Sequence, residues 1–332
     1  MNEERDLNDE ARFVSTSKRQ PETTSRIRGA LLDALVQQAA SLPPIRVGVI
    51  HPCDAVSIEG AIAARARGLI APRLIGPRAK IEAAARAAKL SIDGLEIVET
   101  PHSHAAAEAA VALVRQGQLD ALMKGSLHTD EVMRAVVRTS DGLRTERRIS
   151  HVFVIDAPAY PKLLLVTDAA INIAPNLDVK RDIVRNAIDL AHAIGLARPK
   201  VAILSAVETV EGKIPSTIEA AALCKMADRG QIVGGDIDGP LAFDNAISKA
   251  AAAAKGIVSP VAGDADILVA PDLEAGNILA KELVFLAGAD TAGLVLGARV
   301  PIILTSRADD VASRIASCAL AKLFGHRRRI LV

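Results

Sequence analysis

Short apolar runs alternate with longer segments of helical periodicity along most of the chain. The first apolar runs are IRVGVI (45–50), PRLIG (72–76), LEIVE (95–99) and DALMKG (120–125). Helical patterns separate them, at 57–68, 78–89 and 103–117, and another helix starts at Thr129. This alternation predicts an α/β fold with a mainly parallel sheet that helices cover on both faces. Ligands of such sheets bind at the carboxyl ends of the strands.

The alternation of predicted strands and helices is interrupted near the middle of the chain. HVFVIDAP (151–158) and KLLLVTDAA (162–170) are separated only by AYP, which predicts a hairpin. Alternation then resumes, with strands expected at 200–206, 231–235, 265–272, 292–298 and 301–306 and helices at 178–194, 216–228, 243–254 and 275–287. We therefore expect two α/β domains with a boundary near the hairpin, preceded by a polar, mobile extension over residues 1–25.

Composition narrows the possible functions. Half of the residues are hydrophobic but only 2% are aromatic, and the formal net charge is +1. Without a basic field or stacking aromatics, we expect no nucleic-acid binding. The three cysteines are far apart and form no ligand cluster with histidines, so no metal site is expected. The charged N-terminus and the lack of a long apolar run predict a cytoplasmic protein that does not bind membranes.

Polar residues gather where several predicted strands end. Lys124, Gly125, Ser126, His128 and Thr129 lie between a strand and a helix, where a glycine, a lysine and a helix N-terminus favour an anion. Arg134 follows one turn into that helix. The alternative is a solvated loop in which Thr129 caps the helix.

Further polar residues follow later strands. Asp168 comes directly after an apolar run, where an unpaired carboxylate would be costly, and Asn172 follows it. Later strand ends add Asp236, Asp238, Asp244, Asp272 and Asn277. A turn with a helix cap explains any one of them alone. Together they predict a cleft.

The last predicted strand ends in the stretch LTSRADD (304–310). Ser306 could be the N-cap of the next helix, with Asp309 as its capping-box partner. Arg307 does not fit this explanation, because a cation at a helix N-terminus opposes the dipole. The glycine-rich motifs of the usual dinucleotide enzymes and P-loop NTPases are missing, which disfavours both classes.

At these stretches the sequence resembles the phosphate acetyltransferase and phosphate butyryltransferase family. The resemblance rests on HPCDAVSIEGA, MKGSLHTDEVMR, RRISHVFVIDAP, VTDAAINIAPNLDVKRDIV, DGPLAFDNAIS, PDLEAGNILAKELVFLAGADTAGLVLG and LTSRADD, in this order. It covers about Ile45 to Leu323, and several stretches look closer to the butyryl-type branch.

The resemblance implies a fold and an activity. The fold is two α/β/α domains flanking a cleft, similar to isocitrate and isopropylmalate dehydrogenases, with 26–150 and 298–332 in the first domain and 151–297 in the second. Homodimers are usual in the family. Its members move an acyl group between coenzyme A and inorganic phosphate without a bound cofactor or metal, so acyl-CoA and phosphate are the expected partners.

The resemblance also implies site residues. Ser306 and Arg307 match a family Ser-Arg pair, Asp310 matches the catalytic aspartate better than Asp309, and Arg134 matches an arginine of the coenzyme A site. Because the thiol pKa of coenzyme A is about 8.5, a carboxylate that accepts its proton would assist attack on an acyl phosphate. Two alternatives remain: a dehydrogenase of the same fold, and a ligand-binding domain without turnover.

Overall fold

The computed structural model describes residues 28–305 and 309–330. Its strands are β1 (Ile45–Ile50), β2 (Ile70–Gly76), β3 (Glu96–Glu99), β4 (Ala121–Lys124), β5 (Ser150–Asp156), β6 (Leu164–Thr167), β7 (Lys200–Leu204), β8 (Asp236–Leu241), β9 (Ile267–Val269), β10 (Asp290–Leu296) and β11 (Ile302–Ile303). Its helices are α1 (Ala30–Ala40), α2 (Ala55–Ala66), α3 (Arg78–Ala87), α4 (Ser103–Arg115), α5 (Thr129–Val136), α6 (Leu177–Ala193), α7 (Pro215–Asp228), α8 (Phe243–Ile247), α9 (Lys249–Ala254), α10 (Leu273–Phe285) and α11 (Val311–Ile330).

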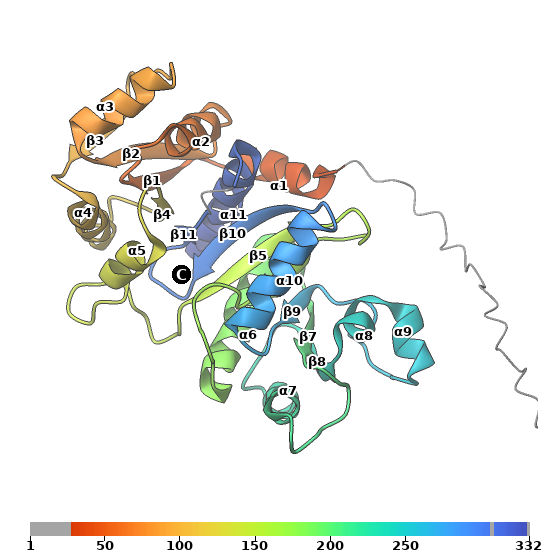
Figure 1. Ribbon diagram of the computed structural model, residues 1–332. Coiled ribbons are helices and arrows are strands. Elements are labelled where there is room, and N and C mark those ends of the chain that lie inside the picture. The colour runs from red at the N-terminus through yellow and green to blue at the C-terminus, as the bar shows by residue number, and fades with distance from the viewer. Residues whose placement is uncertain (1–27, 306–308, 331–332) are drawn as a thin grey trace, which may run out of the picture.

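All of these strands join one sheet in the order β3-β2-β1-β4-β11-β10-β5-β6-β9-β7-β8 (Figure 1). Neighbouring strands are parallel except in the pairs β11–β10, β10–β5 and β5–β6. The mainly parallel α/β prediction is confirmed, and so is the β5–β6 hairpin. The antiparallel pairs reverse the direction of the sheet, so β1–β4 and β11 run opposite to β6–β9.

Strands from both halves end near the centre of the sheet. One row of paired residues crosses it, formed by Met123, Ile303, Leu294, Val152, Thr167 and Val269. The strands β4, β11, β6 and β9 all end at this row or one residue beyond it. Since the two halves run in opposite directions, the carboxyl ends of both meet at the middle, where a ligand of an α/β sheet is expected.

The two faces of the sheet are covered differently. On one face a single hydrophobic core runs through both halves and includes residues of α1, α2, α6, α7 and α11. On the other face there are two separate cores, one under α4 and α5 and one under α8 and α10. Figure 1 shows α5 and α10 on either side of the central strands. The gap between these two cores leaves part of β5 and β10 without a helical cover.

Two predicted elements differ from the structure. The strand expected at 231–235 is wrong: Gly234 has a φ of +96°, the chain turns there, and β8 begins only at Asp236. β8 contains a Gly-Pro pair, which an edge strand tolerates. The helix expected at 243–254 is divided because Ser248 is extended and its side chain caps α9.

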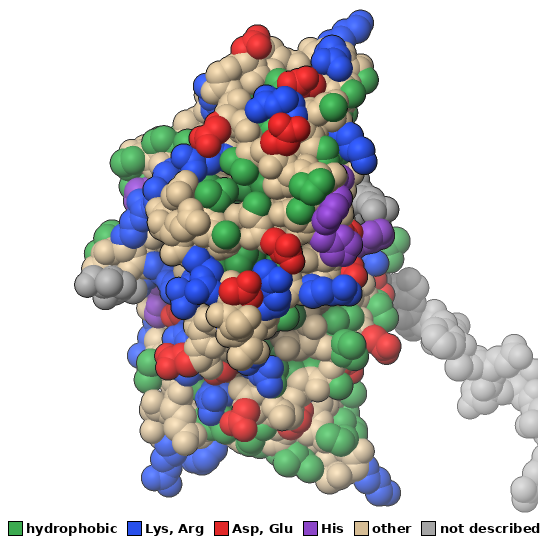
Figure 2. Space-filling model, turned by 90° about the vertical axis from the view of Figure 1, so that its left-hand side faces the viewer, with side chains coloured by type: hydrophobic (Ala, Val, Ile, Leu, Met, Phe, Trp, Pro, Cys, Tyr) green, Lys and Arg blue, Asp and Glu red, His purple; other side chains and the backbone are tan. Residues whose placement is uncertain are grey.

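The division into two domains stays a prediction. Strands from 45–124 and 302–303 lie together at one end of the sheet, and strands from 150–296 lie at the other. The N-terminal extension lies outside the described residues. Among the described helices, none has the length and hydropathy required to cross a bilayer. Figure 2 shows basic and acidic side chains interspersed over the α3–α5 side of the molecule.

Candidate active site

A cleft of about 430 Å³ lies over the part of β5 and β10 that no helix covers. Alternate residues of β5 face it, because Val152 and Val154 point into the shared core and His151 and Phe153 point the other way. Its lining residues are Arg28, Thr129, His151, Phe153, Ala170, Asn277, Ala280, Lys281, Val284, Phe285, Ala289, Asp290, Thr291, Leu304, Thr305, Asp309, Asp310 and Ser313. The cleft therefore lies between α5 and α10, at the row where the strands end.

Of the predicted site residues, Thr129, Asn277 and Asp310 line this cleft, as does Asp309, the alternative to Asp310. They come from α5, from α10 and from the residues before α11. Ser306 and Arg307 lie outside the described residues, but their neighbours Thr305 and Asp309 both line the cleft. Three segments far apart in the sequence thus meet at one cavity.

The residue before α11 caps this helix. The helix begins at Val311, and Asp310 Oδ1 accepts a hydrogen bond of 2.8 Å from the backbone N–H of Ser313, which is the geometry of an N-cap. This bond uses one carboxylate oxygen of Asp310 and holds the side chain in place at the cleft. The predicted capping role of Ser306 falls on a residue outside the described ranges.

Below this segment, a buried arginine supports the end of β11. Arg314 is 4% exposed, and its Nη1 donates a hydrogen bond of 2.7 Å to Thr305 Oγ1. Burial lowers the pKa of Arg314, while the nearby Asp54 and Asp309 carboxylates act in the opposite direction. The guanidinium therefore fixes Thr305 from behind the cleft.

The β4–α5 loop packs against the end of β1. Gly125 is required there, because a Cβ atom would lie 2.5 Å from the carbonyl oxygen of Ile50. The buried Lys124 donates through Nζ to the carbonyl oxygens of Gly125 and Leu127, at 3.3 and 3.2 Å. Ser126 accepts through its own carbonyl oxygen from His51 Nδ1 at 3.0 Å, with the proton on that nitrogen.

These contacts shape the loop and place the N-terminus of α5 at the cleft. Thr129 is the first residue of α5, and Glu131 accepts from the backbone N–H of the exposed His128 at 3.1 Å. Lys124, Gly125, Ser126, His128 and the exposed Arg134 are not among the lining residues, so their predicted contacts with substrate stay predictions.

The segment after β6 is organised by Asp168, which is 2% exposed. Its Oδ1 accepts from the backbone N–H groups of His151, Ala170 and Ile171. Its Oδ2 accepts from the backbone and the side chain of Asn172, at 3.0 and 2.6 Å. Neither Asp168 nor Asn172 lines the cleft. Their hydrogen bonds hold Ala170 in its wall.

Asn277 joins this segment to α10. Its Nδ2 donates to the carbonyl oxygen of Ala169 at 3.0 Å. Of the other polar strand ends, Asp272 accepts from the N–H of Ala275 and caps α10, and Asp236 pairs with Arg198 at 2.6 Å. Asp236, Asp238, Asp244 and Asp272 do not line the cleft, so the prediction that all the polar strand ends form one site is wrong for these four.

His151 is one of the cleft residues that the sequence analysis missed. Its side chain is buried at 1% exposure, and its Nδ1 has no hydrogen-bond partner among the described residues. Burial lowers the pKa of His151 to about 4, against a smaller opposing effect of Asp168, so the ring is neutral at pH 7. It packs edge-on against Phe153, with ring centroids 4.3 Å apart. One feature of the sequence could have identified it: His151 is a polar residue in a strand whose side chains alternate between two buried faces.

The charged groups of the cleft come from several elements. Arg28 pairs with Asp290 at 2.8 Å on its rim. Lys281 of α10 makes no ion pair with the described part of the chain, and Asp309 and Asp310 also line the cleft. Within the described ranges, no group of three His, Cys, Asp or Glu side chains could hold a metal ion.

Comparisons with known proteins show which family the chain belongs to. A family model described as phosphate acetyl/butaryl transferase matches residues 103–322. A phosphate acetyltransferase of Rhizobium meliloti is 64% identical over 90% of this chain and 94% of its own. A phosphate butyryltransferase of Clostridium acetobutylicum is 40% identical over 87% and 96%. The crystal structure of a branched-chain phosphotransacylase from Enterococcus faecalis superposes with a TM-score of 0.75, at 31% identity, covering 85% of this chain and 99% of that one.

These findings confirm the resemblance found in the sequence and give no support to the dehydrogenase alternative. The names of the relatives include both acetyl- and butyryltransferases, so the preference for the butyryl-type branch stays a prediction. The match to the family model alone covers more than half of the 332 residues. This chain belongs to the phosphate acetyl/butyryl transferase family.

Proposed function

We propose that this protein transfers a short acyl group, from acetyl to butyryl, between coenzyme A and inorganic phosphate: acyl-CoA + phosphate = acyl phosphate + CoA. The observation that carries the proposal is the cleft where the strand ends meet, because it brings Asp310, Thr129 and Asn277 together in a chain of this family.

Asp310 is the proposed general base. Its Oδ1 is held by the N–H of Ser313, and Oδ2 remains to accept a proton. When an acyl phosphate is the substrate, this oxygen takes the proton of the coenzyme A thiol, and the sulfur attacks the acyl carbon. The tetrahedral intermediate then expels phosphate. In the opposite direction phosphate attacks the thioester carbonyl, and Asp310 returns the proton to the departing thiolate.

The neighbouring residues are proposed to stabilise charge. Ser306 donates to the oxygen of the tetrahedral intermediate or to phosphate, and Arg307 binds phosphate or offsets the thiolate charge. Arg314, which holds Thr305, supports this segment from behind. The α5 N-terminus at Thr129 favours a phosphate oxygen, and Lys281 can bind a phosphate group of coenzyme A.

The acyl chain is proposed to contact the apolar part of the cleft. Phe153, Ala280, Val284 and Leu304 are among its apolar lining residues. One methylene group in such a pocket changes discrimination by only about 1–3 kcal/mol, so the acetyl-to-butyryl range is the class that the site supports. His151, neutral and buried beside Phe153, supplies a ring nitrogen for a substrate oxygen.

We further propose that the protein is a cytoplasmic homodimer with two isocitrate dehydrogenase-like domains. Ile278 and Phe285 of α10 and Leu286, the residue after this helix, are exposed at 57%, 74% and 85%. An exposed apolar set of this kind is typical of an interface.

Thiol release from acetyl-, propionyl- and butyryl-CoA, with and without inorganic phosphate, tests the proposal. Release that requires phosphate is expected, and the ranking of the three substrates assigns the acyl chain. Release at the same rate without phosphate would indicate a thioesterase and contradict the transferase. The absence of release from all three would leave a binding domain.

A further inference from the structure

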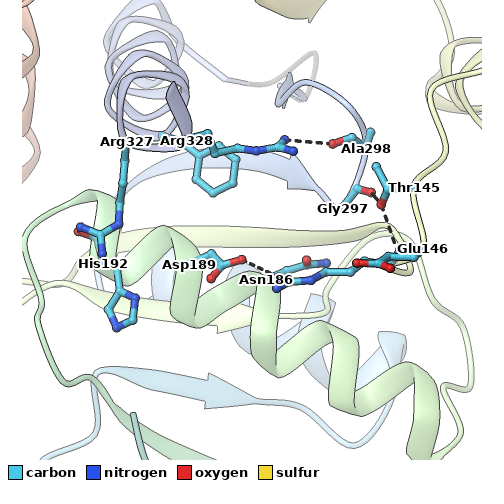
Figure 3. Close-up of a pocket in the computed structure, with 11 residues that line it drawn as sticks. Thr145, Glu146, Asn186, Asp189, His192, Gly297, Ala298, Arg327 and Arg328 are labelled. Atoms are coloured by element: carbon cyan, nitrogen blue, oxygen red, sulfur yellow. Dashed lines mark hydrogen bonds and ion pairs between the residues drawn. The ribbon is translucent and has the colours of Figure 1, made fainter. Parts of the chain in front are cut away.

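A second cavity, of about 380 Å³, lies on the face of the sheet opposite to the cleft. It is formed by the C-terminal end of α11, by α6, by the loop at 145–147 and by the turn after β10 (Figure 3). Both α6 and α11 pack on the shared core, whereas the cleft lies on the face with two separate cores. None of the residues lining this cavity lines the cleft, so nothing in the proposed reaction uses it.

Two arginines of α11 reach into this cavity without an acidic partner. Arg327 donates to the carbonyl oxygen of His192 at 3.2 Å, and Arg328 donates to those of Ala298 and Arg299 at 3.2 and 3.1 Å. Neither has a carboxylate within ion-pair distance in the described part of the chain. A helix dipole favours basic residues in a last turn, but these two side chains extend to α6 and to the β10 turn, away from their own helix (Figure 3).

A third arginine and two acidic residues also line the cavity. Arg147 forms an ion pair with Asp189 of α6, so these two charges offset each other. Glu146 is exposed and makes no hydrogen bond or ion pair with the described residues. Three guanidinium groups therefore face two carboxylates, and the uncompensated positive charge is on Arg327 and Arg328.

One wall of the cavity is aromatic. The Phe324 ring, 6% exposed, lies below Arg328, whose Cζ is 5.9 Å from the ring centroid. This contact holds the Arg328 side chain over the ring and leaves the second amino group and Nε of its guanidinium without a partner in the described ranges. The cavity thus combines two oriented cations, an apolar surface and a single open carboxylate.

We propose that this cavity binds a phosphomonoester of a small hydroxylated molecule. The two guanidinium groups reach different walls of the cavity (Figure 3), and each keeps N–H donors that can bind the phosphate or a neighbouring oxygen of such a ligand. Glu146 can accept hydrogen bonds from hydroxyl groups, and the Phe324 wall takes the carbon skeleton. Because the two cavities lie on opposite faces of the sheet, coenzyme A in the cleft does not compete with this ligand.

Isothermal titration with ribose 5-phosphate, at an ionic strength of about 0.05 M to limit screening, tests the proposal. Inorganic phosphate is titrated in parallel, and both titrations are repeated with saturating coenzyme A to occupy the cleft. The variants are Arg327→Gln and Arg328→Gln. The control is Arg329→Gln, which removes the same charge from the next residue, but from an ion pair with Asp120 outside the cavity.

We expect one site for ribose 5-phosphate, bound more tightly than inorganic phosphate and unaffected by coenzyme A. Its affinity should fall about tenfold or more in Arg327→Gln and in Arg328→Gln and by less than about twofold in the control. Absence of binding, loss of binding with coenzyme A, or an equal loss in all three variants would overturn the proposal. Inorganic phosphate that binds as tightly as the ester, and that loses this affinity in Arg327→Gln and Arg328→Gln, would overturn the assignment of an ester. Far-UV spectra and melting temperatures of the variants show that they are folded.

Discussion

Replacement of Asp168 should separate a structural role from direct contact with substrate. The carboxylate is buried and accepts five hydrogen bonds, three at Oδ1 and two at Oδ2. At about 0.5–1.5 kcal/mol for each net bond, Asp168→Ala loses about 2.5–7.5 kcal/mol of unfolding free energy. We expect a loss of about 3–5 kcal/mol, because most of these donors are only part-buried and water can replace the carboxylate there.

Asp168→Asn should lose less unfolding free energy than Asp168→Ala, and the size of its loss shows how much the hydrogen bonds at Oδ2 contribute. The amide oxygen can still accept at the Oδ1 position from the N–H groups of Ala170 and Ile171. The amide nitrogen would replace Oδ2 and face two donors of Asn172, so we expect a loss of about 1–3 kcal/mol. Asp272→Asn is the matched control, since asparagine caps a helix as well as aspartate and should change stability by less than about 0.5 kcal/mol.

Urea unfolding followed by circular dichroism measures these differences, provided that the m-values agree. A loss below about 1 kcal/mol for Asp168→Ala, or equal losses for the alanine and asparagine variants, would refute the structural account. If Asp168→Asn keeps its stability but raises the KM for phosphate or acyl-CoA strongly, Asp168 contacts substrate directly, as the sequence analysis predicted.

Three further predictions follow from the cleft. Asp310→Asn should lower kcat about 10²–10⁴-fold in the thiol-release assay while the melting temperature is kept, because asparagine still caps α11; an active variant would exclude Asp310 as the base. His151 has a pKa of about 4 when folded and an ordinary value near 6.5 when unfolded, so the unfolded chain binds the proton first as the pH falls. The free energy of unfolding should therefore drop by up to about 3 kcal/mol between pH 7 and 4. His151→Gln should remove that part of the pH dependence in urea unfolding. The same dependence of unfolding free energy on pH in the variant would contradict the lowered pKa of His151. In Gly276→Ala the new Cβ would lie 2.5 Å from the carbonyl oxygen of Asp168, so we expect a loss of about 1–3 kcal/mol by thermal unfolding, and a wild-type melting temperature would show that α10 moves freely.

The strand pattern could be predicted because buried parallel strands are continuous apolar runs. The run IRVGVI became β1, and the close pair at 151–158 and 162–170 became the β5–β6 hairpin. β8 could not be predicted in the same way: it is an edge strand with a Gly-Pro pair, and the more apolar QIVGG before it ends in glycines that turn the chain. Local composition does not show which strand is at an edge.

The candidate site was predictable only in part, for a related reason. Sequence shows which residues follow a strand, but it does not show where that strand ends relative to the others. Asp310 and Asn277 reach the cleft because the strands that precede them, β11 and β9, end at the central row. Asp236 is instead the first residue of β8 and pairs with Arg198. His151 could not be identified from strand ends at all, since it lies within β5 and faces the cleft only because no helix covers that strand there.

Phosphorus NMR of a reaction that contains butyryl-CoA and inorganic phosphate tests the central claim most directly. The account predicts that an acyl phosphate resonance grows as inorganic phosphate declines, with one free thiol for each acyl phosphate formed. The Asp310→Asn variant should slow both signals together. Thiol that appears with free carboxylic acid, and without acyl phosphate at any time, would contradict the account.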